Sequence, residues 1–199
     1  MIIDRSSYNF VYIITIGMII ATGWMLYRNS HEEVTLVKSK VDNREYLVQN
    51  KGDKNAAADL LANVKINLTK LVKHCENKYK RRSDVRRMVE RFNPDAITES
   101  SHKNKYTSYS INKGEKIVFC LRSRDEKQKL IDLNTIMFVA VHELAHVMTL
   151  STGHTEEFWK NFKFLLQEAI AINIYTEQDY SVKPQKYCGL TITHTPLND

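Results

Sequence analysis

The chain has 199 residues, which is enough for one domain of ordinary size. Its 29 Lys and Arg residues exceed its 23 Asp and Glu residues, so the formal net charge is +6. This mild basic excess is compatible with an anionic membrane or nucleic acid and requires neither, and the lack of fixed-period repeats or low-complexity segments excludes a repeat array.

An uncharged stretch near the N-terminus predicts a transmembrane helix at residues 10–27. The stretch reads FVYIITIGMIIATGWMLY, and as a helix it would span about 27 Å, close to the thickness of a bilayer's hydrocarbon core. Tyr12, Trp24 and Tyr27 lie near its ends, where aromatic rings favour the membrane interface. A cleaved signal peptide is the alternative, but apolar residues continue beyond its candidate cleavage site at 21–23. We therefore expect an uncleaved single-pass anchor.

The charges that flank this stretch predict its orientation. Arg5 precedes it, and a group of basic residues between Arg28 and Arg44 follows it. Under the positive-inside rule, this excess places the main domain in the cytoplasm. The expected order is an anchor at residues 1–28, a stalk with a short hairpin at 29–52, and the main domain at 53–199.

The segments after the stalk predict a hairpin and two helices. VTLVKSK and REYLVQN, joined at residues 42–43, have the pattern of two short strands. Apolar residues at three- and four-residue spacing predict a buried helix from Lys54 to about Cys75. A shorter helix should begin after Ser83 and end before Asn93 and Pro94.

The turn between those two helices holds the densest positive charge in the chain. Its sequence, KYKRRSDVRR at residues 78–87, is compatible with a solvated corner between helices. The alternative is contact with phosphate groups of lipid or nucleic acid, which makes nucleic acid a candidate partner. Tyr79 is its one aromatic residue, so base stacking is not supported. The basic residues of this corner are Lys78, Lys80, Arg81, Arg82, Arg86 and Arg87.

The second half of the chain predicts a strand pair followed by two helices. Residues 106–111 and 117–121 have strand-forming patterns on either side of an Asn-Lys-Gly turn. LNTIMFVAVHELAHVMTL, residues 133–150, is apolar on nearly every face and should form a central buried helix. The last helix should begin after Thr155, which can cap it. The tail YSVKPQKYCGLTITHTPLND has no regular pattern.

Two histidines and a glutamate in the buried helix indicate a metal site. His142 and His146 are four residues apart, so a helix projects both from one face, about one turn apart. Imidazoles at this spacing can share one zinc ion. Glu143 then lies beside the metal, where its carboxylate can hold a metal-bound water and accept its proton. Burying these groups without partners would cost several kcal/mol, which disfavours a purely structural role.

A catalytic zinc site requires a third protein ligand and an open position. His154 is the preferred candidate, because it follows Gly153, which permits a tight reversal of the chain toward the metal. Glu168 is the alternative, because one class of zinc peptidases takes a glutamate from the helix that follows. The cofactor expected from these residues is Zn²⁺.

The string HELAH, followed by GH and a helix that bears aromatic residues, resembles the WLM and SprT-like zinc metallopeptidases. The similarity is detailed over residues 133–166. The segments REYLVQNKGDKNAAADLLANV and KGEKIVFCLRSRDEK also resemble small WLM-like proteins encoded by large DNA viruses. The resemblance implies an α+β, minimal zincin-like fold, in which a small sheet and supporting helices surround the metal-bearing helix. It implies His142, His146 and His154 as zinc ligands and Glu143 as general base.

The sequence also departs from related enzymes. Metzincins carry HExxHxxGxxH, whereas Thr149 and Thr152 stand here where their glycine and third histidine would be, so the chain is not a metzincin by motif. The cellular relatives are soluble and act on proteins crosslinked to DNA; this chain has a predicted anchor, and nothing in it indicates that substrate. The viral resemblance would place such an anchor in a host or virion membrane.

These features together predict a membrane-anchored zinc metallopeptidase that hydrolyses peptide bonds with a metal-activated water. Glu143 would accept the proton of that water and pass it to the leaving amine. A second group must stabilise the intermediate, and the tyrosines after the last helix are candidates that the sequence does not separate. They are Tyr175, Tyr180 and Tyr187.

A peptide substrate should lie extended along a strand edge, at either 106–111 or 117–121. Two other functions remain open at this point. The chain could be a structural or interaction protein of a membrane that keeps zinc as a folding staple, or a nucleic-acid-associated protein that uses the basic corner. The intact Glu143 argues against the staple, which has no need of a general base.

The cysteines, Cys75, Cys120 and Cys188, are far apart and odd in number, which does not indicate a disulfide framework. We therefore expect free thiols in a reducing compartment. Cys188 lies in the irregular tail, from which a thiolate could reach the open position of the zinc and silence the enzyme. The alternative is a tail that packs on the body, with Cys188 as a small apolar filler.

Overall fold

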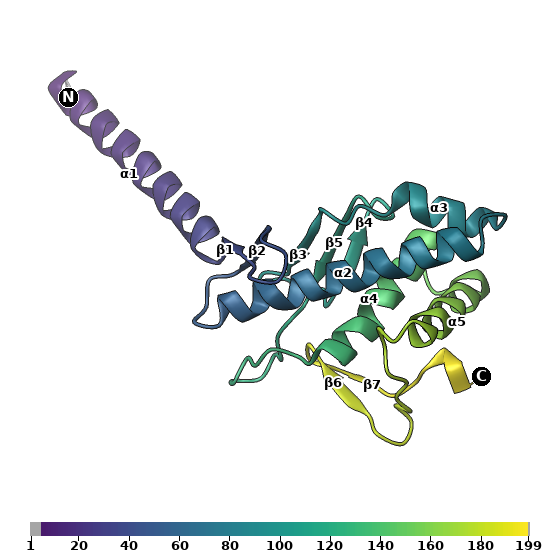
Figure 1. Ribbon diagram of the computed structural model, residues 1–199. Coiled ribbons are helices and arrows are strands. Elements are labelled where there is room, and N and C mark those ends of the chain that lie inside the picture. Colours follow the sequence, from purple (N-terminus) through teal and green to yellow (C-terminus); the bar gives the residue numbers. More distant parts are fainter. Residues whose placement is uncertain (1–4, 199) are drawn as a thin grey trace.

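The computed structural model describes residues 5–198, in which an α+β domain carries a long N-terminal helix that projects away from it (Figure 1). The predicted α+β class is confirmed. The helices are α1 (Arg5–Glu32), α2 (Lys54–Lys78), α3 (Ser83–Arg91), α4 (Leu133–Met148), α5 (Glu156–Ala171) and the short 3-10 helix η1 (Pro196–Asn198). The strands are β1 (Val34–Lys38), β2 (Glu45–Gln49), β3 (Ile97–Glu99), β4 (Tyr109–Ile111), β5 (Lys116–Phe119), β6 (Gln185–Tyr187) and β7 (Leu190–Ile192).

Helix α4 lies at the centre of the packing, as its apolar pattern predicts. Ile136, Met137 and Leu144 of this helix are completely buried. Helices α2, α3 and α5 all contact it (Figure 1). Burial of each such side chain stabilises the fold by about 1.5–3 kcal/mol, so the core fixes the rotation of α4 about its axis. That rotation decides where the polar residues of α4 point.

The strands form small sheets, of which the three-stranded one matters for the site. Its order is β3-β5-β4, with β3 parallel to β5 and β4 antiparallel to β5. The predicted strand pair is therefore confirmed, with β5 at the centre and β4 at an edge. In the described part of the chain, no strand pairs with the outer side of β4. The predicted hairpin after the stalk is also confirmed as β1 and β2.

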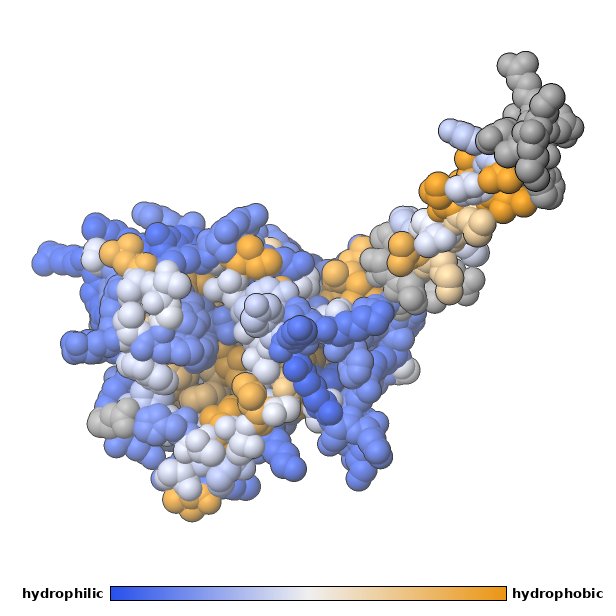
Figure 2. Space-filling model, turned by 180° about the vertical axis from the view of Figure 1, so that it is seen from behind, coloured by the Kyte–Doolittle hydropathy of each residue, from blue (hydrophilic) through white to orange (hydrophobic). Residues whose placement is uncertain are grey.

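The predicted membrane anchor is not supported. Residues 10–27 do lie within α1, whose apolar side chains are exposed as the helix leaves the domain (Figure 2). Within the described residues, however, no helix is long and apolar enough to cross a membrane. Phe10, the first residue of the predicted span, lies outside the residues whose side chains are described.

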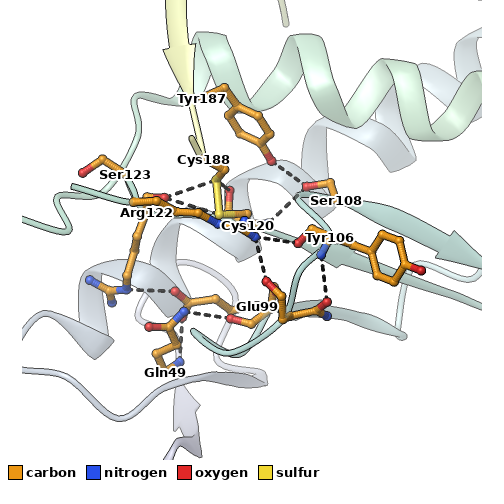
Figure 3. Close-up of a disulfide and its surroundings, with 12 residues drawn as sticks. Gln49, Glu99, Tyr106, Ser108, Cys120, Arg122, Ser123, Tyr187 and Cys188 are labelled. Carbon is orange, nitrogen blue, oxygen red and sulfur yellow. Dashed lines mark hydrogen bonds and ion pairs between the residues drawn. A yellow bond between two sulfur atoms is a disulfide. The ribbon is translucent and has the colours of Figure 1, made fainter. Parts of the chain in front are cut away.

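The expectation of free thiols is wrong for Cys120 and Cys188 and confirmed for Cys75, and the expectation of an irregular tail is wrong. Cys120, just after β5, and Cys188 form a disulfide across 68 residues of sequence (Figure 3). Of the described cysteines, Cys75 is the free one. The tail contains the hairpin of β6 and β7, which pair with each other. Cys188 and Gly189 connect the two strands, with φ angles of 48° and 82°. Two left-handed residues in succession make the tight turn that suits a hairpin. The inference of a reducing compartment therefore loses its basis.

Candidate metal centre and catalytic carboxylate

Three histidine rings converge beside helix α4. His142 and His146 project from the same face, with ring centroids 4.9 Å apart. His154 reaches them from the loop before α5, at 5.0 Å from each ring. The Nε2 atoms of His142 and His154 are 3.1 Å apart, and one nitrogen from each of the three rings lies within 4.8 Å of the others.

This donor set suits a zinc ion. Two nitrogens bound to one tetrahedral zinc at about 2.0–2.1 Å are roughly 3.3 Å apart, which is close to the spacing seen here. Burial, with His146 and His154 nearby, lowers the pKa of His142 to about 3. Burial, with His154 and the Lys113 ammonium group nearby, lowers the pKa of His146 to about 4. Both imidazoles are therefore neutral at neutral pH, which is the form that binds a metal.

Aromatic rings support the cluster from α5. Phe158 is fully buried, and its ring stacks on His146 at a centroid distance of 4.3 Å. The same ring lies 4.9 Å from His142 and 4.7 Å from His154. Phe162 adds an edge-on contact to His142 at 5.1 Å. These contacts restrict the rotamers of the histidines, so the nitrogens are already oriented toward a common point.

Two charged side chains hold the loop that carries His154. Lys113, from the turn between β4 and β5, donates to the carbonyl oxygens of Thr149 and Ser151 at 2.9 Å each, and to that of Leu150. Glu157, in the first turn of α5, accepts from the backbone N–H groups of Leu150 and Ser151 at 3.0 and 3.2 Å. The Lys113 ammonium group thus binds the carbonyl groups that follow α4, where a helix C-terminus favours a cation, and the Glu157 carboxylate binds the backbone amides of the same loop.

The chain reverses direction after residues 149–151, the segment that Lys113 and Glu157 bind. Gly153 has a φ of 84°, in the left-handed region that glycine adopts readily. The predicted reversal before His154 is therefore present. Thr155 then caps α5 by accepting from the Phe158 backbone N–H, which confirms the predicted helix start.

Glu143 lies beside the histidines and is 5% exposed. Burial raises the pKa of its carboxyl to about 8, and a hydrogen bond with the Ser110 backbone opposes that rise. Ser110 belongs to β4, so the contact joins the carboxylate to the edge strand. A buried carboxylate with this raised pKa can both accept and donate a proton near neutral pH. A nearby cation would lower the pKa again, because it stabilises the charged form.

The histidines and Glu143 open into one cavity of about 730 Å³. Residues 107–110, which include the start of β4, form one wall, and the hairpin of β6 and β7 forms another. Phe138 and Val139 of α4 supply an apolar floor. A cavity of this size, with a few polar groups grouped at one side, is typical of a small-molecule or peptide site.

The other predicted site residues separate into two groups. Tyr187 lines the cavity, and its hydroxyl lies 2.5 Å from that of Ser108. Tyr175 and Tyr180 are instead buried behind Phe138, with their hydroxyl oxygens 3.5 Å apart.

Glu168, the alternative third ligand, is hydrogen-bonded to other side chains, away from the histidine cluster. Its carboxylate lies 2.6 Å from His74 Nε2, and it accepts from Tyr79 at 2.5 Å and from Lys78 at 3.1 Å. These bonds join α5 to α2. Glu168 does not belong to the histidine cluster found among the described residues. Cys188 is also unavailable to a metal, because its sulfur is bonded to Cys120.

The basic corner is partly neutralised within the fold. Lys78 pairs with Glu168, and Arg82 pairs with Asp84 at 2.7 Å while its guanidinium covers the ring of Phe164 at 3.9 Å. Arg87 donates to the Met148 carbonyl at 2.7 Å, next to the loop described above. The exposed basic residues of the corner are Lys78, Lys80, Arg81 and Arg86, and of these Lys78 is paired with Glu168.

Sequence reasoning missed Lys113, Ser110 and the hairpin wall. Lys113 stands in an ordinary turn sequence, and its role comes from the fold that brings that turn to the end of α4. Ser110 contributes through its backbone, which leaves no trace in residue type. The hairpin carried one signal, the Cys-Gly pair at its turn, which is a weak one without a partner for the cysteine.

The chain is similar to several known proteins. The WLM domain family matches residues 40–195. Protein R325 of Acanthamoeba polyphaga mimivirus, described as uncharacterized, is 36% identical over 191 residues, which cover 94% of this chain and 96% of that protein. Protein 136R of Invertebrate iridescent virus 6 is 27% identical over 160 residues, which cover 77% of this chain and 87% of that protein. The crystal structure of Wss1 from Saccharomyces cerevisiae matches 63% of this chain and 86% of its own, with 24% identity and a TM-score of 0.47.

Proposed function

The chain belongs to the WLM family, similar to proteins of large DNA viruses, and from this premise we propose that it is a zinc-dependent metallopeptidase. The observation that carries the proposal is the opening of three clustered histidines and a buried glutamate into one cavity. In the proposed assignment, His142, His146 and His154 hold zinc and Glu143 is the general base. Zinc, when bound, would supply a Lewis acid that lowers the pKa of a water and polarises a carbonyl group.

Glu143 performs the proton transfers in this proposal. Its pKa of about 8 in the metal-free protein shows how strongly the site disfavours a bare carboxylate, and a bound cation restores the charged form. The ionised carboxylate accepts a proton from the attacking water and later donates it to the leaving amine. The hydrogen bond from the Ser110 backbone holds the carboxylate in place between these two steps.

The edge strand β4 is the proposed docking site for the substrate backbone. Of the two strands suggested by the sequence, β5 is enclosed between β3 and β4, and β4 has an unpaired outer side within the described chain. Residues 107–110 also line the cavity. A peptide added to this edge would gain main-chain hydrogen bonds and pass beside Glu143.

Tyr187 is the proposed partner of the developing negative charge. Among the candidate tyrosines it is the one that lines the cavity. Burial raises the pKa of Tyr187, so its hydroxyl keeps its proton and remains a hydrogen-bond donor. A neutral donor of this kind stabilises an oxyanion when it is already positioned.

The second candidate function, a protein that keeps zinc as a folding staple, has less support. A staple needs ligands but no buried carboxylate beside an open cavity. Nucleic-acid binding also stays a proposal for the basic corner, through the exposed Lys80, Arg81 and Arg86. It would appear as DNA affinity that falls steeply with salt, and loss of that affinity in the triple Ala variant would support it.

The test of the peptidase proposal is zinc-dependent cleavage. The full chain is loaded with zinc, stripped by a chelator and reloaded, and hydrolysis of a denatured protein is followed by mass spectrometry of the fragments. We expect cleavage with zinc, loss on stripping and recovery on reloading. Zinc binding without any cleavage would favour the folding staple instead.

A further inference from the structure

The hairpin of β6 and β7 forms a wall of the cavity that the proposed catalytic groups do not explain. Tyr187, Leu190, Thr191 and Ile192 of this hairpin line the cavity. Leu190 is 59% exposed, although it is a large apolar residue. Ile192, Phe138 and Val139 line the same cavity, and apolar residues grouped in this way mark a surface that a ligand covers.

The hairpin depends on a few ties to the body of the domain. Its two strands, of three residues each, pair only with one another in the described structure. An isolated two-stranded hairpin is marginally stable in water. The position of this hairpin must therefore be set by contacts outside its own ladder.

The disulfide is the covalent tie, and it holds the hairpin at its turn (Figure 3). Cys188 is 2% exposed and is bonded to Cys120 at the end of β5. A second tie runs beside it. The Ser108 hydroxyl lies 2.5 Å from the Tyr187 hydroxyl and accepts from the Cys120 backbone N–H at 3.1 Å. Tyr187 and Cys188, which are adjacent in the hairpin, are thus joined to Ser108 and Cys120 next to strands β4 and β5.

The attachment point is itself fixed. Arg122, two residues after Cys120, is 3% exposed and pairs with Glu99 at 2.8 Å (Figure 3). Its guanidinium group also pairs with Asp53 at 2.6 Å. Glu99 also accepts from the Gln49 backbone N–H at 2.6 Å. Breaking one partner of such a buried pair is costly, so this end of β5 stays in place. The disulfide transmits that rigidity to the wall.

We infer that the β6–β7 hairpin is a specificity wall, held over the cavity by the Cys120–Cys188 disulfide, and that it selects an apolar substrate side chain. Leu190 and Ile192 form the wall, and Phe138 and Val139 form the floor, so a side chain lying between them meets apolar surface. Alternate side chains of a peptide on the β4 edge point to the same face, which brings one of them into this position. The inference deepens the proposed peptidase function and rests on it for the identity of the substrate.

Peptide binding tests the wall separately from catalysis. The zinc-loaded Glu143→Gln variant of the full chain is titrated by fluorescence anisotropy with short peptides that carry Leu or Asp at one position at a time. The quantity measured is the ratio of the two Kd values at the position with the strongest preference. We expect Leu to be preferred, and we expect the combined Leu190→Ser and Ile192→Ser changes to reduce the ratio roughly tenfold or more.

A second variant tests the tether. Cys120→Ser with Cys188→Ser should reduce the same ratio while zinc content stays at one ion per chain. Val182→Ser is the matched control, because Val182 is an apolar residue of the same tail, is 80% exposed and does not line the cavity. The control should leave the ratio within about twofold of the parent value. If the Cys variant fails to fold, the Leu190 and Ile192 variant decides the question.

The outcomes separate the two proposals. The wall is overturned if no Leu preference exists, if the ratio is unchanged in the hairpin variants, or if Val182→Ser reduces it equally. Turnover by the zinc-loaded wild-type chain is measured in parallel. If the wild type does not cleave while the Leu preference exists and depends on the hairpin, the peptidase proposal fails and the wall stands as part of a peptide-binding site.

Discussion

The Nζ atom of Lys113 lies 2.9 Å from the carbonyl oxygen of Thr149, which joins the turn between β4 and β5 to the end of helix α4. The same ammonium group binds the next two carbonyls, and His154 follows a few residues later. The strand pair that offers the proposed substrate edge is therefore linked directly to the loop that carries the third histidine. We therefore expect the proposed metal centre to be sensitive to Lys113, which is not one of its proposed ligands.

We expect Lys113→Met to lower zinc affinity by roughly tenfold to a hundredfold, the range found when an outer partner of a metal ligand is lost. Without the ammonium, the carbonyls of the loop lose their donor and His154 loses its fixed starting position. Zinc affinity is measured by competition with a chromophoric chelator, and Lys127→Met in the exposed loop is the control. A zinc affinity equal to that of the control would show that the contacts of Lys113 with the loop do not support metal binding.

The identity of the third ligand is tested by comparing His154→Ala with Glu168→Gln. We expect His154→Ala to lose most of its zinc, because two histidines alone hold the ion weakly. Glu168→Gln should keep one zinc per chain and lose stability instead, because its carboxylate accepts from Tyr79 and Lys78. Metal analysis after dialysis gives the answer. The opposite pattern of zinc loss would transfer the ligand role to Glu168.

The stability of the metal-free protein should be greatest near pH 6.5. The pKa values of His142 and His146 fall from 6.5 to about 3 and about 4 on folding, so the unfolded chain binds more protons below pH 6.5. Glu143 has its pKa raised from 4.5 to about 8, so the folded chain holds a proton that the unfolded chain lacks. Between about 4.5 and 6.5 the two histidines outweigh the one glutamate, and stability falls as pH falls.

Above about pH 6.5 the slope of stability against pH changes sign. In this range Glu143 is the one of the three groups whose protonation differs between the folded and unfolded chains, so stability falls as pH rises toward 8. Denaturant unfolding at about pH 5, 6.5 and 8 measures both slopes. Glu143→Gln is the matched variant, since its amide does not titrate, and it should lose the decline on the alkaline side while keeping the acidic one. An unchanged alkaline decline in that variant would mean that Glu143 is not the group responsible.

Gly114 should tolerate no side chain. Its φ is 116°, and an added Cβ would lie 2.5 Å from the Arg91 carbonyl oxygen and 2.9 Å from a methyl carbon of Val147. Gly114→Ala should therefore destabilise the protein by about 2 kcal/mol or more, since it combines backbone strain with overpacking. Gly52→Ala is the control, because nothing lies within 4 Å of its added Cβ. Equal unfolding midpoints for the two variants would contradict this packing.

Much of the fold could be predicted because its elements are long and periodic. The stripe of α2 and the all-round apolar character of α4 reflect burial directly, and the structure has both helices where the patterns indicate. Strand β3 was missed because it has three residues, Ile97–Glu99, too few to show an alternating pattern. Its place is set by pairing with β5, which the local sequence does not encode.

In the candidate site, too, local features could be predicted and long-range ones could not. The spacing of His142 and His146 is a local property of a helix, so their meeting could be predicted. Tyr187 could not be separated from Tyr175 and Tyr180, because the hairpin that brings it to the cavity depends on a disulfide between distant residues. That pairing depends on the path of the whole chain, and an odd number of cysteines conceals it.

The central claim is that Glu143 transfers protons beside a histidine-bound zinc. The most direct test loads wild type and Glu143→Gln with zinc and compares turnover of the same peptide at pH 7.5, with Glu126→Gln as an exposed control. We predict that all three proteins hold one zinc per chain, and that Glu143→Gln alone loses at least about a hundredfold in kcat. Substantial turnover by zinc-loaded Glu143→Gln would contradict the account.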